Sequence, residues 1–195
     1  AIMNEYNQII VDTIRSTGGN NAKRFIMVEG IGGRWKYITN SLFKMPKDKT
    51  KDRLIPTAQK LPMGFTLNPG PGGYGSKIYT EGIRKQINAM FEALDKMYFK
   101  KHVPVYLSEV CGGPLGIPVM ERINCMKDFM AEVTKDGRSC NITLHPADDY
   151  QNKTSDFDPW NIKWNEKPEY FDTIFYGAQG KEYPLSAEFI KNNET

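Results

Sequence analysis

The sequence has few of the residues that build metal sites or disulfide frameworks. Its 195 residues include three cysteines and two histidines. Cys111, Cys125 and Cys140 lack metal-ligand spacing, so we expect free thiols, with one disulfide as the alternative, and neither a metal site nor a cofactor. No apolar run approaches the ~20 residues that span a bilayer, and no secretory leader pattern is found. A membrane partner is therefore not predicted.

A strong excess of one charge is also missing. The formal net charge is +3, and the charged residues, 25% of the total, are spread along the chain. A nucleic-acid surface would need clustered lysine and arginine, and the one basic segment, Phe43–Arg53, is interpreted as a solvated loop. Hydrophobic residues make up 39% of the chain, which is enough for a core. We expect a single domain over residues 1–195 and no nucleic-acid partner.

The apolar pattern alternates between helix and strand. Helical spacing predicts helices, at residues 1–15, 80–101, 119–137 and 186–192. In the first of these, the residues at helical spacing are Ile9, Ile10, Val11 and Ile14. Short apolar runs beside glycine or proline predict strands, at residues 24–33, 61–75, 103–110 and 139–146. A lysine-rich helix or loop is expected between the first two strands, and a polar, Trp-bearing loop after the fourth.

Strands and helices that alternate every 30 to 40 residues, roughly, are typical of parallel βαβ units. The predicted strands are continuous apolar runs, as in sheets that are covered on both faces. The fold class is therefore α/β. Four strands are half the number that closes a (β/α)8 barrel, so closure needs further strands.

Polar side chains follow the predicted strands, where sites form in parallel α/β folds. Glu109 ends the third strand, after six apolar or small residues and shortly before two glycines. Glu29 ends the first strand, Asn68 the second and His145 the fourth. A shared cleft would bring these groups together. The alternative for each is a solvent-facing loop residue, which we favour for Glu29 and His145 taken singly, whereas for Glu109 we favour a functional role.

Two motifs carry a resemblance to a known family. The segment "NEYNQIIVDTIRSTGGNNAKRFIMVEG", Asn4–Gly30, closely resembles the link between the fourth helix and fifth strand in glycoside hydrolase family 5, the cellulase type. "KKHVPVYLSEVCG", Lys100–Gly112, resembles the seventh-strand motif of that family, whose glutamate is the catalytic nucleophile. The match runs from residue 4 to about residue 145, and more loosely to the end.

The resemblance implies a partial TIM-type (β/α) barrel with about four parallel strands, running from helix four through strand eight and the final helix. It makes Glu109 the nucleophile of a retaining β-glycan hydrolase of the endoglucanase type. Such a mechanism needs a second carboxyl group ~5–5.5 Å away to protonate the leaving oxygen. The family places that acid in an Asn-Glu-Pro motif. In "MNEY", Tyr6 stands where the proline is needed, and Glu5 is expected on a helix surface.

Other positions depart from the family pattern. Where the sixth strand of the family has His-x-Tyr, Leu67 and Pro69 lie nearest, and where the eighth strand has a Trp, this chain has Thr143 or Leu144. Asn68 and His145 remain candidate substrate-binding groups. The candidates that could stack on the sugars of a β-glucan or mannan are Trp160, Trp164 and Tyr74. For the two tryptophans, packing against the end of the half barrel is the alternative.

Three hypotheses account for half a barrel. The chain is part of a longer or two-piece enzyme, inactive alone, whose N-terminal half supplies four strands and the acid. Alternatively, it pairs with itself, which closes eight strands but brings two copies of Glu109 and no family acid. In the third, it is a non-catalytic descendant that binds glycans or a protein partner. The resemblance also implies secretion, because polymeric glycans lie outside the cell.

Overall fold

The computed structural model describes residues 2–59, 78–110, 117–144 and 167–194. These residues fall into two compact units. The first, the sheet unit, comprises Ala1–Leu61, Met90–Glu109 and Gly137–Thr143. The second, the helical unit, comprises Pro62–Ala89, Val110–Asp136 and Leu144–Thr195.

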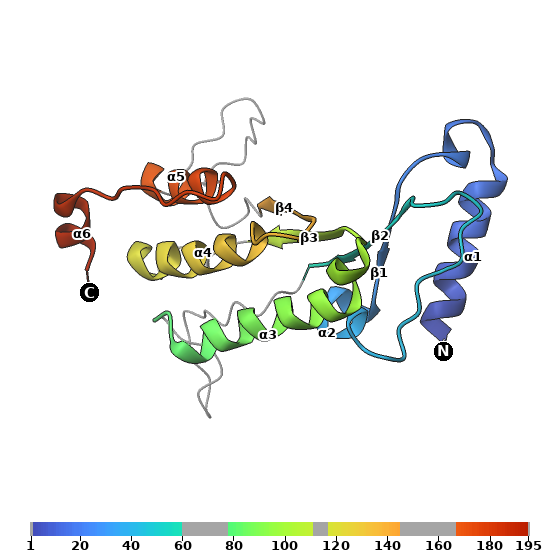
Figure 1. Ribbon diagram of the computed structural model, residues 1–195, viewed down its shortest axis with the longest axis horizontal. Helices are drawn as coiled ribbons and strands as arrows, with labels where there is room; N and C mark the ends of the chain where they lie inside the picture. Colours follow the sequence, from blue (N-terminus) through green and yellow to red (C-terminus); the bar gives the residue numbers. More distant parts are fainter. Residues whose placement is uncertain (1, 60–77, 111–116, 145–166, 195) are drawn as a thin grey trace, which may run out of the picture. The chain divides into compact units, whose positions relative to one another are not determined.

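The sheet unit contains four parallel strands, β1 (Ile26–Glu29), β2 (Leu54–Ala58), β3 (Val105–Val110) and β4 (Cys140–Leu144), in that order across the sheet. Figure 1 labels the four strands. Ile26 lies opposite Leu54, and Thr57 lies opposite Tyr106. The unit also holds α1 (Ile2–Ser16), the short α2 (Trp35–Ile38), and 3-10 turns at Gly19–Ala22, Ile31–Gly33 and Phe99–Lys101. The predicted α/β class and partial parallel barrel are confirmed.

The core of the sheet unit forms where α1 covers β1. Val11, Ile26 and Val28 are buried together, and Ile14, Phe43, Met45 and Leu54 pack against them. The inward stripe of α1 is therefore Asn7, Val11 and Arg15, spaced one helical turn apart. Ile9 and Ile10, two of the residues whose spacing predicts this helix, are exposed.

Residues 61–75, the predicted second strand, lie outside the described residues. The second strand of the sheet is β2, at Leu54–Ala58, where the sequence pattern did not predict a strand. The cause is Pro56, because proline inside an apolar run normally argues against a strand. Pro56 lies opposite Val28, and pairing with β3 begins one residue later, at Thr57. The lack of an N–H on Pro56 therefore removes no hydrogen bond from the pairing of β2 with β3.

The residues named as nearest to the His-x-Tyr positions of the family belong to the same predicted segment. Leu67 and Pro69 lie outside the described residues. The end of β2 instead carries Ala58, which is fully buried, and Gln59 follows it.

The basic segment Phe43–Arg53 is a loop, and side chains of α1 hold it. The Asn4 amide binds Leu42 and Lys44, and the Gln8 amide bonds to both backbone groups of Lys47. Arg15 donates to both oxygens of Asp48, at 2.9 and 2.6 Å, and the two side chains are 3% and 6% exposed. The lysines of this loop therefore extend from a fixed backbone.

Asp48→Asn should make stability less sensitive to acid. Hydrogen bonds from Arg15 hold the pKa of the Asp48 carboxyl below its ordinary value of 3.8. A carboxyl group with a lowered folded-state pKa stabilises the fold above its ordinary pKa, and this stabilisation is lost as the pH falls through the lowered value. We expect the variant to be less stable near neutral pH, with a shallower loss below about pH 4.

Urea unfolding followed by circular dichroism over this pH range measures the effect. Asp12→Asn is the matched control, because Asp12 is exposed on α1, the helix that carries Arg15. Parallel pH profiles for the wild type and Asp48→Asn would contradict the role given to this ion pair.

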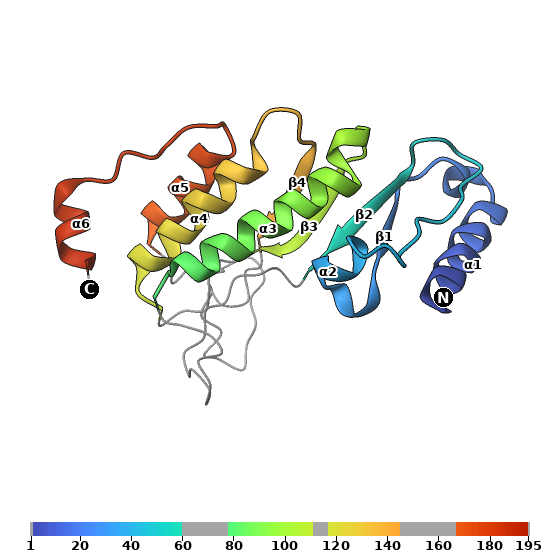
Figure 2. The same cartoon turned by 60° about the horizontal axis from the view of Figure 1, so that its bottom comes forward.

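The helical unit contains the first part of α3 (Glu81–Met97), together with α4 (Val119–Val133), α5 (Pro168–Gly177) and α6 (Ala187–Asn193). Helices α4 and α5 lie side by side in Figures 1 and 2. A Cβ on Gly177 would lie 2.6 Å from that of Met130, so the glycine permits this close approach. Arg122 is buried with its guanidinium carbon 4.6 Å from the ring centroid of Tyr170.

Three of the four predicted helices, α1, α4 and α6, match with small shifts of their ends, and the helix predicted at 80–101 is α3 followed by a 3-10 turn. Helix α5 lies in the segment predicted as loop. Its signals are Pro168 in the first turn and buried Tyr170 and Ile174 four residues apart. Within the described ranges, no helix has the length and apolar character needed to cross a bilayer.

Cys140 is a half-buried free thiol, Cys125 is buried, and Cys111 lies outside the described residues. Burial raises the pKa of the Cys140 thiol to about 12. This thiol therefore stays protonated near neutral pH and is a poor nucleophile.

Candidate functional site

The two faces of the sheet differ in character. Ile26, Val28 and Leu107 point to the buried face. The opposite face would line the inside of a barrel and is called the open face; it carries a row of one residue per strand, Glu29, Thr57, Tyr106 and Thr143, of which Thr57 is buried and Thr143 is exposed. Strand register places Glu29 beside Thr57 and Thr57 beside Tyr106. The hydroxyls of Tyr106 and Thr143 are 2.8 Å apart. The side chains that would line the inside of a barrel are therefore largely polar.

Glu109 lies three residues beyond Tyr106 on β3, at the end of the strand, and is exposed. Its backbone is left-handed, with φ at 57°. Val105 and Leu107 are fully buried, and regular alternation would put residue 109 on their face. Instead, Val110 is fully buried. The left-handed residue thus shifts the alternation by one position and takes the carboxylate out of the buried face.

Glu109→Gly should leave the fold stable or make it more so. A left-handed conformation costs a residue with a Cβ roughly 1–2 kcal/mol, and glycine avoids that cost. After glycine's greater loss of backbone entropy, we expect a net gain of about 0.5 kcal/mol, measured by urea unfolding. Ser108→Gly, at the neighbouring extended position, should instead lose about 0.5–1 kcal/mol. Equal losses in both variants would show that the conformation at residue 109 carries no strain.

Glu29 is the other acidic residue on the four strands, and it is directed elsewhere. Strand register places Glu29 beside Thr57 and Thr57 beside Tyr106, so Glu29 is two strands away from β3. At normal strand spacing this separation is about 10 Å. Its Oε1 lies 3.0 Å from the place of a Cβ on Gly33, in the turn that follows β1. Glu29 is therefore not positioned as the partner carboxyl of Glu109 that a retaining mechanism needs.

The candidate substrate-binding residues all lie outside the described ranges: Asn68, Tyr74, His145, Trp160 and Trp164. Of the two residues considered for the strand-eight tryptophan position, Thr143 is exposed on the open face and Leu144 is half-buried. Glu5 is exposed on α1, as expected. Sequence reasoning missed the row formed by Thr57 and Tyr106, although Tyr106 stands within the seventh-strand motif.

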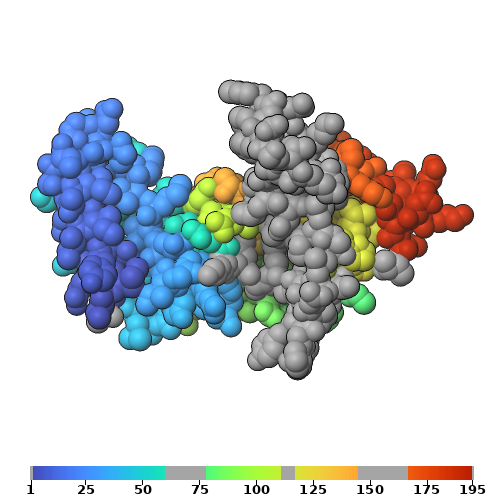
Figure 3. Space-filling view, turned by 180° about the vertical axis from the view of Figure 1, so that it is seen from behind, coloured from blue at the N-terminus to red at the C-terminus, as the bar shows by residue number. Residues whose placement is uncertain are grey.

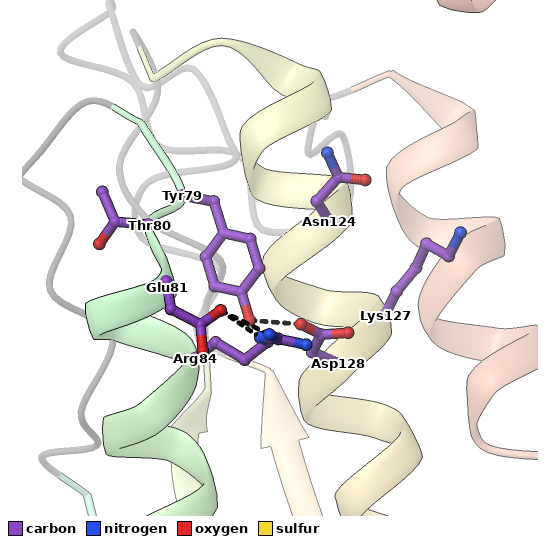
Figure 4. Close-up of a pocket in the computed structure, with 7 residues that line it drawn as sticks. All are labelled: Tyr79, Thr80, Glu81, Arg84, Asn124, Lys127 and Asp128. Carbon is purple, nitrogen blue, oxygen red and sulfur yellow. Dashed lines mark hydrogen bonds and ion pairs between the residues drawn. The ribbon is translucent and has the colours of Figure 1, made fainter.

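The helical unit has a polar pocket of about 370 Å³ between the start of α3 and α4 (Figure 4). The Tyr79 hydroxyl donates to Asp128 at 2.6 Å, and its backbone N–H donates to the Glu121 carboxylate at 2.6 Å. Burial, together with the Asp128 hydrogen bond, raises the pKa of Tyr79 well above its usual range. The polar groups of the pocket form hydrogen bonds with one another, so we interpret the pocket as a structural contact that holds the two helices together.

Two curated relatives are similar in sequence. Endoglucanase 1 of Ruminococcus albus is 30% identical over 135 residues, which are 69% of this chain and 31% of the relative. Endoglucanase A of Paenibacillus barcinonensis is 44% identical over 59 residues, 30% of this chain and 15% of the relative. No family model matches the chain. The chain spans about a third of the length of the Ruminococcus albus relative.

Solved structures of family 5 enzymes share the fold. A variant of the lichenase from Caldicellulosiruptor sp. F32, in complex with cellotetraose, is 30% identical with a TM-score of 0.62 over 72% of this chain and 39% of the enzyme. A broad-specificity endoglucanase from an uncultured bovine rumen ciliate is 25% identical, with a TM-score of 0.71 over 91% of this chain and 54% of the enzyme. The chain thus corresponds to part of these longer folds.

Proposed function

Because this chain is related to the cellulase-type glycoside hydrolases of family 5 by both sequence and fold, we propose that it is a module of a retaining β-glucan hydrolase with Glu109 as the nucleophile. The observation that carries the proposal is the position of Glu109: an exposed carboxylate at the end of a parallel strand, with a left-handed backbone that takes it out of the buried face. Rigid strand ends suit a nucleophile, whose distance to the acid must be held closely.

The reaction has two displacements. The Glu109 carboxylate attacks the anomeric carbon, the bond to the leaving oxygen breaks, and an acid protonates that oxygen. Water then attacks the glycosyl-enzyme and gives its proton to the same acid group, acting now as a base, and Glu109 is released. Both steps invert the carbon, so the product keeps the β configuration.

The acid/base comes from a complementing N-terminal half in this proposal. Of the acids on the four strands, Glu29 is directed toward Gly33 and is not beside Glu109. A solved relative that is 30% identical is more than twice as long as its match to this chain, which leaves room for such a half. The chain alone is therefore expected to be inactive, and its site is expected outside the cell, where β-glucans occur.

A non-catalytic glycan-binding module of the same fold is the second candidate. The observation in its favour is Thr143, which occupies the open face of β4 near the place where the family has a tryptophan. Such a module would bind soluble β-glucan and release no sugar. Affinity electrophoresis on β-glucan and mannan gels distinguishes it from a partner-binding relic, which would migrate unchanged on both.

Hydrolysis of mixed-linkage β-glucan tests the enzyme proposal. The assay compares the chain alone with the chain plus a separately expressed N-terminal half, taken from the Caldicellulosiruptor lichenase outside the matched region. We expect reducing ends only from the mixture, with the β-anomer seen first by proton NMR. Release of the α-anomer first would contradict a retaining mechanism, and a bound but unhydrolysed glucan would favour the second candidate.

A further inference from the structure

The fold gathers basic residues that are far apart in the sequence at one edge of the sheet unit. The strands of the sheet run parallel, so the segments that lead into them meet at the same edge, which we call the strand-start edge. The N–H of Ile26 at the start of β1 donates to the carbonyl of Arg53, just before β2. The segments before β1, β2 and β3, at residues 23–25, 49–53 and 100–104, hold seven lysines and arginines: Lys23, Arg24, Lys49, Lys51, Arg53, Lys100 and Lys101.

The cations of the strand-start edge are at the surface and are not neutralised by nearby acids. Six of the seven residues are exposed, and Arg53 is half-buried. Two acids of the sheet unit, Asp48 and Asp95, are bound instead to Arg15 and Arg138. Seven cations and one acid, Asp52, give the three segments a formal charge of +6, whereas the whole chain carries +3.

A hydrogen bond joins the first two segments. The Thr50 hydroxyl donates to the carbonyl of Ala22 at 2.7 Å. Thr50 stands between Lys49 and Lys51, and Ala22 directly precedes Lys23, so this bond brings the two groups of cations together. The chain between α1 and β1, blue at the upper left of the space-filling view, lies at the surface (Figure 3).

The other cations also extend from an ordered backbone. The guanidinium carbon of Arg53 lies 4.4 Å from the ring centroid of Phe25. Lys100 and Lys101 belong to the 3-10 turn Phe99–Lys101. A ligand that binds here therefore orders side chains and leaves the backbone as it is, which lowers the entropic cost of binding.

We propose that the strand-start edge binds an anionic polysaccharide of the polyuronate class, through contacts between its carboxylates and these lysines and arginines. Each exposed ion pair contributes little, so stable binding requires a polymer that repeats the anion and makes many contacts at once. Glu109 ends β3 and lies at the opposite edge, so the bound polymer leaves the proposed catalytic site free. The inference rests on the proposed function for the choice of a polysaccharide, and it adds a second surface to that function.

The side chains favour a carboxylated polymer over a nucleic acid. Five of the seven cations are lysines, which act as point charges and lack the planar fork with which arginine binds phosphates and stacks on bases. Single-stranded nucleic acids also need free aromatic rings on which bases stack. Phe25 is the one aromatic residue in the three segments, and Arg53 lies over its ring.

Calorimetric titration of the chain alone with polygalacturonate tests the inference. The matched ligand is fully methyl-esterified polygalacturonate, which keeps the sugar backbone and lacks the charge. We expect only the charged polymer to bind, with an affinity that falls at least about tenfold as the salt is raised from about 0.05 M to about 0.5 M, because surface ion pairs are screened.

Charge reversal locates the binding surface. The double variant Lys51→Glu with Lys101→Glu should weaken binding at least about tenfold, since it replaces two attractions with repulsions. Arg34→Glu with Lys36→Glu is the matched control. It changes the net charge equally at exposed positions that follow β1, at the opposite edge, and should bind within about threefold of the wild type. Circular dichroism checks the fold of both variants, and Lys49→Gln with Lys100→Gln replaces a first variant that does not fold.

Four results would overturn the inference. These are no binding of polygalacturonate, equal binding of its methyl ester, equal losses in the edge variant and its control, and tighter binding of single-stranded RNA or anionic lipid vesicles than of polygalacturonate at the same salt. The last would assign the surface to another partner. Glu109→Gln should bind polygalacturonate normally, so failure of the proposed nucleophile and failure of this binding surface give different results.

Discussion

Glu109→Gln is expected to lower β-glucan hydrolysis by the completed barrel at least about a thousandfold, which corresponds to about 4 kcal/mol of activation free energy. Glutamine keeps the size of the side chain but cannot form the glycosyl-enzyme ester, so the first displacement loses its proposed nucleophile. Steady-state rates with β-glucan and with an activated aryl cellobioside measure the loss. A variant within about tenfold of the wild type would contradict the assignment.

Two controls separate the chemistry from the fold. Glu29→Gln changes the other carboxylate on the open face, and we expect a loss at least tenfold smaller, because Glu29 is directed toward Gly33. In Glu109→Gly, azide should restore part of the turnover of the aryl cellobioside. The azide nitrogen attacks the anomeric carbon as the phenolate leaves, which gives an α-glycosyl azide. A β-glycosyl azide would show that the vacated space lies on the wrong side of the sugar.

Phe91→Ala is expected to lower the free energy of unfolding by about 3–5 kcal/mol. Phe91 is fully buried on α3, and the Arg138 guanidinium carbon lies 4.9 Å from its ring centroid. Arg138 donates to both oxygens of Asp95, at 2.8 and 2.7 Å. Loss of the ring therefore leaves a cavity and removes one side of the packing around a nearly buried guanidinium.

The Phe91→Ala substitution should also disturb the open face, because the cluster of Phe91, Arg138 and Asp95 holds the start of β4. The chain continues from Arg138 to Ser139, whose carbonyl accepts the N–H of Val105 at the start of β3. Urea unfolding measures stability, with Phe91→Leu expected to lose under about 1.5 kcal/mol and the exposed Glu92→Ala within about 0.5 kcal/mol of the wild type. A loss for Phe91→Ala no larger than that for Glu92→Ala would contradict the packing described.

The strongly periodic parts of the fold could be predicted from the sequence. Helix α3 shows why. Five of its apolar residues and the tyrosine that follows it are almost fully buried: Ile83, Ile87, Met90, Phe91, Leu94 and Tyr98. Strand β2 could not, because Pro56 resembles a breaker and is tolerated only through the register of its neighbours. Pairing with β1 and β3 determines β2, and no local sequence pattern predicts this strand.

The sequence predicts one residue of the candidate site, Glu109, and does not predict its neighbours on the sheet. Glu109 could be found from its place after an apolar run, but its left-handed backbone could not, since glutamate has no preference for it. The row of Glu29, Thr57, Tyr106 and Thr143 depends on strand register, which fixes neighbours across distant segments. Ile9 and Ile10 show the reverse case, since their helical spacing correctly predicts the helix although both side chains are exposed.

Mass spectrometry of the completed barrel after inactivation with a 2-deoxy-2-fluoro-cellobioside bearing an activated leaving group tests the central claim most directly. The fluorine slows both displacements, and the activated leaving group lets only the first proceed, so the sugar stays on its nucleophile. We predict the label on the tryptic peptide that follows Lys101 and ends at Arg122, with fragmentation placing it on Glu109. A label on any other residue, or turnover without a label on this peptide, would contradict the account.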